Sequence, residues 1–190
     1  MSPVLMYIRR STCGLVIAAL TMGSCRSSAQ KLQIESVYSN LSEKECKQLT
    51  ADNETGATKD ECSGVVGFKL LVLNDDSRSS ITVVTPEGKE FPLDYWNVVT
   101  HSFSTLGSKA EWRVFREGSR LRPIALIVRV NYLDQERLAT PNRKSILAVA
   151  KITKEKVCVV EIVKSGADGN VRARNAGDHA ATKACLEPQP

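Results

Sequence analysis

Histidines and aromatic residues are scarce in this 190-residue chain. It contains two histidines, and Phe, Trp and Tyr together make up 5% of its residues. The core must therefore consist mostly of Val, Ile, Leu and Ala side chains, and few groups are available for acid–base chemistry near neutral pH. With 42% hydrophobic and 25% charged residues, the composition is that of one ordinary globular domain.

Sequence motifs that bind nucleotides or metals are also missing. There is no Gly-x-x-x-x-Gly-Lys-Ser/Thr loop, no Gly-x-Gly-x-x-Gly turn and no His-Glu-x-x-His pair. No Cys-x-x-Cys pair is present, which argues against a zinc ribbon or finger. We therefore expect no metal and no other cofactor.

Residues 1–29 have the order of features of an export signal. Arg9 and Arg10 precede a mostly apolar run over 11–22, and small residues follow it. The run is too short to span a bilayer, which needs about 20 residues. We therefore predict an exported protein with a single globular domain over 30–190.

Two processing sites compete within this segment. Met22-Gly-Ser-Cys25 resembles the lipobox of bacterial lipoproteins, whose cysteine becomes lipidated, although such boxes usually carry Leu at the position of Met22. Ser27-Ser-Ala29 instead resembles an ordinary signal-peptidase site. We favour lipidation of Cys25, which would anchor the chain on the periplasmic side of a membrane. Cleavage after Ala29 would release it into the periplasm.

Four cysteines remain after the signal segment. An even number in an oxidising compartment indicates two disulfides, and four cysteines allow three pairings. Proximity along the chain favours Cys46–Cys62 and Cys158–Cys185.

The pattern of β-branched and apolar residues predicts an α+β fold. An antiparallel, meander-rich β-sheet is expected over about 64–163, because its short connections force neighbouring strands to be antiparallel. A C-terminal α-helix over 170–185 is expected to pack on this sheet. Near the start, we predict a strand over 31–38, a short helix over 43–49 after a capping box, and a loop over 50–63.

Alternation of side chains predicts how the last strand and the helix meet. Cys158, Val160 and Ile162 should share the core face of the strand. The helix should turn a stripe of small residues toward the sheet. This stripe consists of Ala173, Ala176, Ala180 and Ala184.

Charge is distributed unevenly along the chain. Residues 31–100 carry a net charge of −5 and residues 101–190 a net charge of +7. The basic half could contact a polyanion, such as lipid headgroups or an acidic protein. The candidate contacts are Arg113, Arg116, Arg122 and Arg129. We favour an ordinary solvated face over this contact, and the net charge of +2 from residue 30 onward gives little support for nucleic-acid binding.

Several segments carry a resemblance to a known family. They are Leu106-Gly107, Lys109-Ala-Glu-Trp-Arg113, Pro123-Ile-Ala-Leu-Ile-Val-Arg129, Lys156-Val-Cys-Val-Val160, Asn170, Ala173-Arg174, Asp178 and Cys185. Over about residues 100–186 the chain resembles a family of uncharacterised exported bacterial proteins. The resemblance implies export and one C-terminal disulfide, and it implies no active site.

These observations favour a non-enzymatic binding or structural module of the cell envelope. The sequence does not identify its partner. An acidic envelope component or protein is one candidate, and membrane contact is expected only through an anchor at Cys25. The alternative is a small periplasmic hydrolase that uses His101, with Ser102 or Ser104 as nucleophile. The sequence has no Gly-x-Ser-x-Gly elbow to support that alternative.

Overall fold

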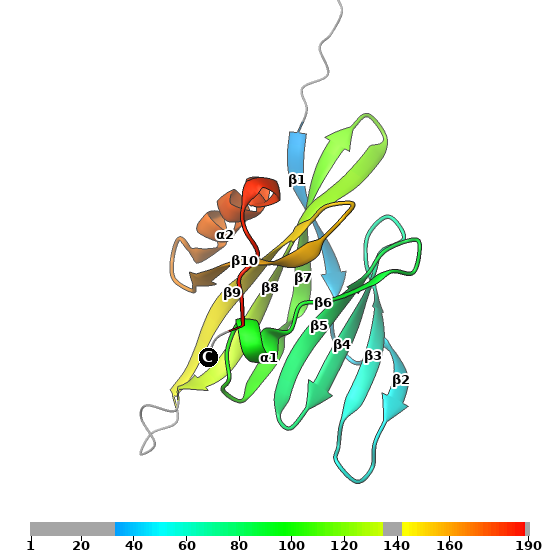
Figure 1. Ribbon diagram of the computed structural model, residues 1–190, viewed down its shortest axis with the longest axis vertical. Coiled ribbons are helices and arrows are strands. Elements are labelled where there is room, and N and C mark those ends of the chain that lie inside the picture. The colour runs from blue at the N-terminus through cyan, green and yellow to red at the C-terminus, as the bar shows by residue number, and fades with distance from the viewer. Residues whose placement is uncertain (1–32, 135–141, 189–190) are drawn as a thin grey trace, which may run out of the picture.

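Two five-stranded antiparallel sheets pack face to face and carry one helix on an outer surface (Figure 1). This computed structural model describes residues 33–134 and 142–188. The predicted export segment, with Cys25 and both candidate processing sites, lies outside the described residues.

The first sheet has the strand order β1-β7-β8-β9-β10. Its two longest strands, β7 and β8, pair with each other along their length as a hairpin. The bounds are β1 (Gln33–Asn40), β7 (Ser104–Glu117), β8 (Arg120–Asp134), β9 (Asn142–Ile152) and β10 (Val157–Lys164).

The second sheet is a meander in sequence order, β2-β3-β4-β5-β6. Its bounds are β2 (Lys47–Ala51), β3 (Thr58–Ser63), β4 (Lys69–Asp75), β5 (Arg78–Val84) and β6 (Glu90–Pro92). The chain leaves this sheet at its edge strand β6. Pro92 is tolerated there because proline has no N–H to donate, and an edge strand has a neighbour on one side only. The chain crosses to the first sheet through the short helix α1 (Tyr95–Val98).

The core between the sheets is aliphatic, as the scarcity of aromatics predicted. Leu70 and Ile81 of the second sheet meet Leu126 and Val128 of the first, and all four are fully buried. Trp112 is the largest buried side chain, and its indole nitrogen donates a 2.6 Å hydrogen bond to Ser39 Oγ.

The C-terminal helix α2 (Gly169–Asp178) covers the outer face of the first sheet. Ala173, Ala176 and Ala180 are buried there, whereas Ala184 is exposed beyond the helix. Gly177 allows the close approach, because a Cβ at this position would lie 3.1 Å from Arg113 Cγ. The observed helix is shorter than the predicted range 170–185, because it ends at Asp178 and the 3-10 turn Ala180–Thr182 follows it.

The antiparallel sheets and the C-terminal helix are confirmed, but the predicted single sheet over 64–163 is wrong. The strands divide between two sheets. Because most described residues are in strands and few are in helices, the protein is closer to all-β, although the α+β prediction is compatible with it. The predicted helix over 43–49 is also wrong. Only one turn forms, where the Glu45 N–H donates to the Ser42 carbonyl, and Lys47 then pairs with Glu61 in a strand.

Both disulfides have the pairing favoured by chain proximity. Cys46 bonds to Cys62 and Cys158 bonds to Cys185. The first disulfide links the residue before β2 to β3, and it thereby favours the pairing of β2 with β3 over the helix that the local sequence predicts. The predicted loop over 50–63 accordingly contains β3.

The predicted face of β10 is only partly correct. Cys158 and Val160 point toward α2, but Ile162 packs on the core between the sheets. The register shifts between Val159 and Glu161, and such a β-bulge reverses the side-chain alternation beyond it.

Candidate functional site

A basic cleft opens at one end of the sandwich, where turns from both sheets come together. It has a volume of about 570 Å³, within the range of small-molecule sites. The β5–β6 turn, the start of β8 and the β9–β10 turn enclose most of it. Its lining residues are Phe68, Thr85, Pro86, Glu87, Lys89, Arg122, Pro123, Ile152, Thr153 and Lys154.

Two hydrogen-bonded turns give the basic cleft fixed walls. In the β5–β6 turn, the Thr85 N–H donates to the Lys89 carbonyl at 2.9 Å, and Gly88 adopts the positive φ of 84° that the turn requires. In the β9–β10 turn, the Thr153 hydroxyl donates to the Lys156 carbonyl at 2.9 Å. These bonds hold the residues between them in place without a ligand.

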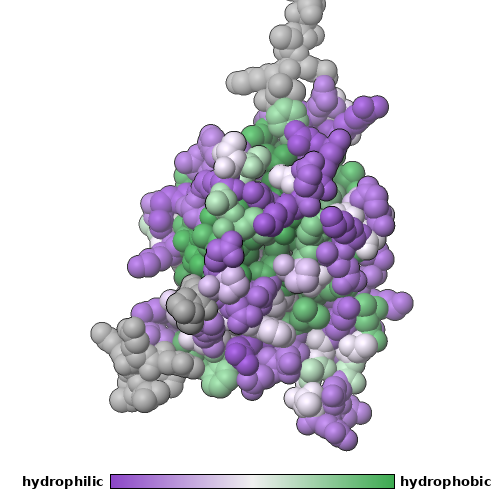
Figure 2. Space-filling model, in the orientation of Figure 1, coloured by the Kyte–Doolittle hydropathy of each residue, from purple (hydrophilic) through white to green (hydrophobic). Residues whose placement is uncertain are grey.

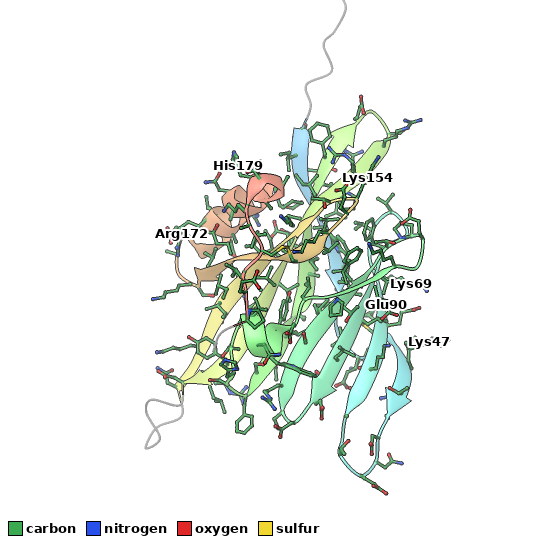
Figure 3. All side chains as sticks on the ribbon, in the orientation of Figure 1. Lys47, Lys69, Glu90, Lys154, Arg172 and His179 are labelled. Atoms are coloured by element: carbon green, nitrogen blue, oxygen red, sulfur yellow. A yellow bond between two sulfur atoms is a disulfide. The ribbon has the colours of Figure 1, made fainter. Side chains whose placement is uncertain are left out.

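Three cations surround the opening of the basic cleft. Lys89 Nζ lies 4.5 Å from the ring centroid of Phe91, and Arg122 Cζ lies 5.2 Å from that of Phe115. Lys154 stands on the β9–β10 turn, where Figure 3 labels it. Within residues 33–134 and 142–188, none of the three has a carboxylate oxygen within 4.0 Å. Their charge is therefore available to a ligand.

Most other arginines of the described chain are paired. Arg116 binds Glu35, Arg174 binds Glu111, and Arg172 binds Asp168. On the face of the molecule that Figure 2 shows, hydrophilic residues surround apolar areas. Unpaired cations such as Lys47 and Arg120 also occur elsewhere on the described surface, so the basic cleft is set apart by the grouping of three cations around one partly apolar hollow.

One carboxylate, that of Glu87, belongs to the basic cleft. A hydrogen bond from the Thr85 side chain lowers its pKa, with a smaller contribution from the Glu87 backbone N–H. The lining therefore carries three positive charges and one negative charge near neutral pH.

The floor of the basic cleft is apolar. Phe68 lies in a tilted contact with the buried Trp112, with 5.8 Å between ring centroids, while Pro123 and Ile152 are buried. Pro123 pairs with Val114 across a register shift in the β7–β8 hairpin. An apolar floor beneath a cationic rim suits a molecule that has an anionic group and an apolar body.

The four arginines proposed from the sequence do not form one surface. Only Arg122 lies in the basic cleft. Arg113 is buried and forms a bidentate pair with Asp178, with Nε–Oδ1 at 2.6 Å and Nη2–Oδ2 at 3.0 Å. Arg116 is paired with Glu35 on β1. Arg129 donates to Ser165 Oγ at 2.7 Å and Asn170 Oδ1 at 3.1 Å, and so helps to attach the start of α2.

The histidines lie away from the basic cleft. His101 is exposed in the connection between α1 and β7, and in the described chain its ring has no carboxylate partner. Ser104 is buried, and its carbonyl oxygen lies 3.3 Å from Ser79 Oγ. His179 directly follows α2, with Nδ1 2.9 Å from the Asn175 carbonyl oxygen.

The described residues contain no group of three or more His, Cys, Asp and Glu side chains that could hold a metal ion. No helix in the same ranges has the length and apolar character needed to cross a bilayer.

Sequence reasoning missed Lys89 and Lys154. Lys89 directly follows the turn signal Pro86-Glu-Gly88, and Lys154 lies within the turn over 153–156. Nothing local indicates that these turns meet, because they belong to different sheets.

Comparison with known proteins gives no relative: no family model, curated protein or solved structure matches this chain.

Proposed function

We propose that this protein is an exported, non-enzymatic binding module that takes a small anionic amphiphile into the basic cleft. The observation that carries the proposal is the combination of Lys89, Arg122 and Lys154, all without carboxylate partners in the described chain, with an apolar floor. A phosphate or carboxylate group would sit among the three cations, and an alkyl or ring portion would cover Phe68 and Ile152.

The two disulfides support an oxidising compartment. We place the module in the periplasm, either anchored through lipidated Cys25 or released by cleavage after Ala29. An anchored module would face the membrane surface, where anionic amphiphiles are abundant.

Mass spectrometry of the native N-terminus tests this location. The expected result is a chain that begins at a diacylated Cys25. A chain that begins at Gln30 without lipid would contradict anchoring and leave a free periplasmic protein, and an unprocessed Met1 would contradict export by this signal.

Affinity for octyl phosphate tests the basic cleft. We expect saturable binding to the protein by calorimetry, and at least about ten-fold weaker binding of octyl glucoside, which has the same chain but no charge. Lys89→Gln, Arg122→Gln and Lys154→Gln should each weaken octyl phosphate binding about five-fold, since each removes about 1 kcal/mol of charge-assisted interaction.

Lys47→Gln is the matched control. Lys47 is an exposed lysine on β2 outside the basic cleft (Figure 3), and its replacement should leave the affinity unchanged. Equal binding of the two ligands, or an equal loss in the Lys47 variant, would show that no specific anion site exists.

A further inference from the structure

A second cleft opens at the other end of the sandwich and contains a buried carboxylate. Asn74 and Ser79 face each other across the β4–β5 turn, whereas the basic cleft lies beyond the opposite end of β5. This second cleft, here the Asp60 cleft, has a volume of about 480 Å³. Its lining residues are Leu41, Ser42, Glu43, Lys44, Asp60, Val72, Asn74, Ser79, Thr105, Leu106, Gly107 and Ser108.

Asp60 is 6% exposed, yet no cation neutralises it within the described chain. Its one hydrogen bond in these residues comes from the Thr58 hydroxyl, at 3.3 Å from Oδ2. A carboxylate has about four acceptor positions, and a buried charge is costly unless it is paired. Asp60 therefore retains unused acceptor capacity at the wall of an open cleft.

The neighbouring polar side chains direct their donors along a chain toward Asp60. Ser79 Oγ donates to Asn74 Oδ1 at 2.6 Å, and Asn74 Nδ2 donates to Thr58 Oγ1 at 3.0 Å. Thr58 Oγ1 then donates to Asp60. With the donors in this order, the Thr58 hydroxyl directs its proton at Asp60 and holds the carboxylate in position.

The remaining lining combines hydroxyl groups with apolar side chains such as Leu41 and Leu106, and its charged groups give a net negative charge. Asp60 and Glu43 oppose Lys44, which lies more than 4.0 Å from the Asp60 carboxylate. Ca²⁺ prefers six to eight oxygen ligands, usually with several carboxylates, and the described residues offer no such acidic cluster. One buried carboxylate with hydroxyl neighbours matches a ligand that brings both positive charge and N–H donors.

We propose that the Asp60 cleft binds a primary ammonium group, with Asp60 as its counter-ion. The ammonium would donate to the free acceptor positions of Asp60, and the hydroxyl-rich wall would receive its remaining protons. This inference is independent of the anionic ligand proposed for the basic cleft.

Titration with butylammonium, followed by amide chemical shifts of the protein, tests the proposal. Saturable shifts are expected at residues 41–44, 58–60 and 105–108. Tetramethylammonium has the same charge but no N–H donor, and butanol has the same chain but no charge, so both should bind at least about ten-fold more weakly.

Two substitutions examine the charge of the cleft. Asp60→Asn should weaken butylammonium binding about ten-fold or more, whereas Asp75→Asn, an exposed aspartate on β4 outside the Asp60 cleft, should have no effect. Lys44→Gln changes an exposed side chain and does not threaten folding. It should strengthen binding about two-fold by removing a like charge.

The proposal is overturned if butylammonium does not saturate, if tetramethylammonium binds equally well, or if neither Asp60→Asn nor Lys44→Gln changes the affinity. Ethanolamine and Nα-acetyl-lysine amide present the same group on a small molecule and on a peptide. The tighter of these two ligands assigns the source of the ammonium.

Discussion

Replacement of Arg113 by Met is expected to lower the free energy of unfolding by about 3 kcal/mol, because it leaves the facing carboxylate without a partner inside the fold. The Arg113 side chain is 9% exposed and that of Asp178 is 25% exposed. The same guanidinium also donates to Ser36 on β1. One side chain therefore connects β1, β7 and the end of α2.

Arg116→Met is the matched control for this prediction. Its side chain is 41% exposed and its partner is Glu35, so the loss should be below about 1 kcal/mol, as for other exposed ion pairs. Urea denaturation measures both variants. Arg113→Met with the stability of the wild type and weakened octyl phosphate binding would contradict a structural role and favour contact with an anion.

Removal of the Cys158–Cys185 disulfide is expected to cost about 3–4 kcal/mol. The disulfide closes a segment with a sequence separation of 27, and a loop of this length gives that figure in the chain-entropy model. The helix that it holds is short and turns only small side chains toward the sheet, and an isolated helix of ten residues is marginal in water.

Limited proteolysis of Cys158→Ser and Cys185→Ser variants should release a fragment that begins near residue 165, while the two sheets survive. Other contacts slow this release without replacing the disulfide. Lys151 Nζ donates to the Lys183 carbonyl at 2.7 Å, and the Leu186 N–H donates to the Val159 carbonyl at 2.8 Å. Cleavage identical to that of the wild type would show that packing and the Arg113–Asp178 pair suffice.

The individual strands could be predicted from the sequence because their signals are local. The apolar alternation over Leu126, Val128 and Val130 and the Pro86-Glu-Gly88 turn correspond to β8 and the β5–β6 hairpin. The division into two sheets could not be predicted, because it depends on β1 crossing to pair with β7. That pairing joins residues 69 to 83 positions apart.

Errors in the prediction arose where tertiary contacts override a local pattern. Ser42-Glu-Lys-Glu45 is a typical helix start. The Cys46–Cys62 disulfide nevertheless holds the residues that follow beside β3, where they form strand β2. The alternation in β10 fails at one bulge before Glu161. The candidate site shows the same limit: Arg122 could be proposed from its charge, but its separation from Arg113 and its proximity to Lys89 and Lys154 are properties of the fold.

The most direct test of the basic cleft is a map of the amide chemical shifts that octyl phosphate changes in the protein. The expected changes are largest in 85–89, 122–123 and 152–154, and they should disappear together in a variant that combines Lys89→Gln, Arg122→Gln and Lys154→Gln. Shifts centred on α2 or on the outer face of the second sheet, or shifts that persist in the triple variant, would contradict the account.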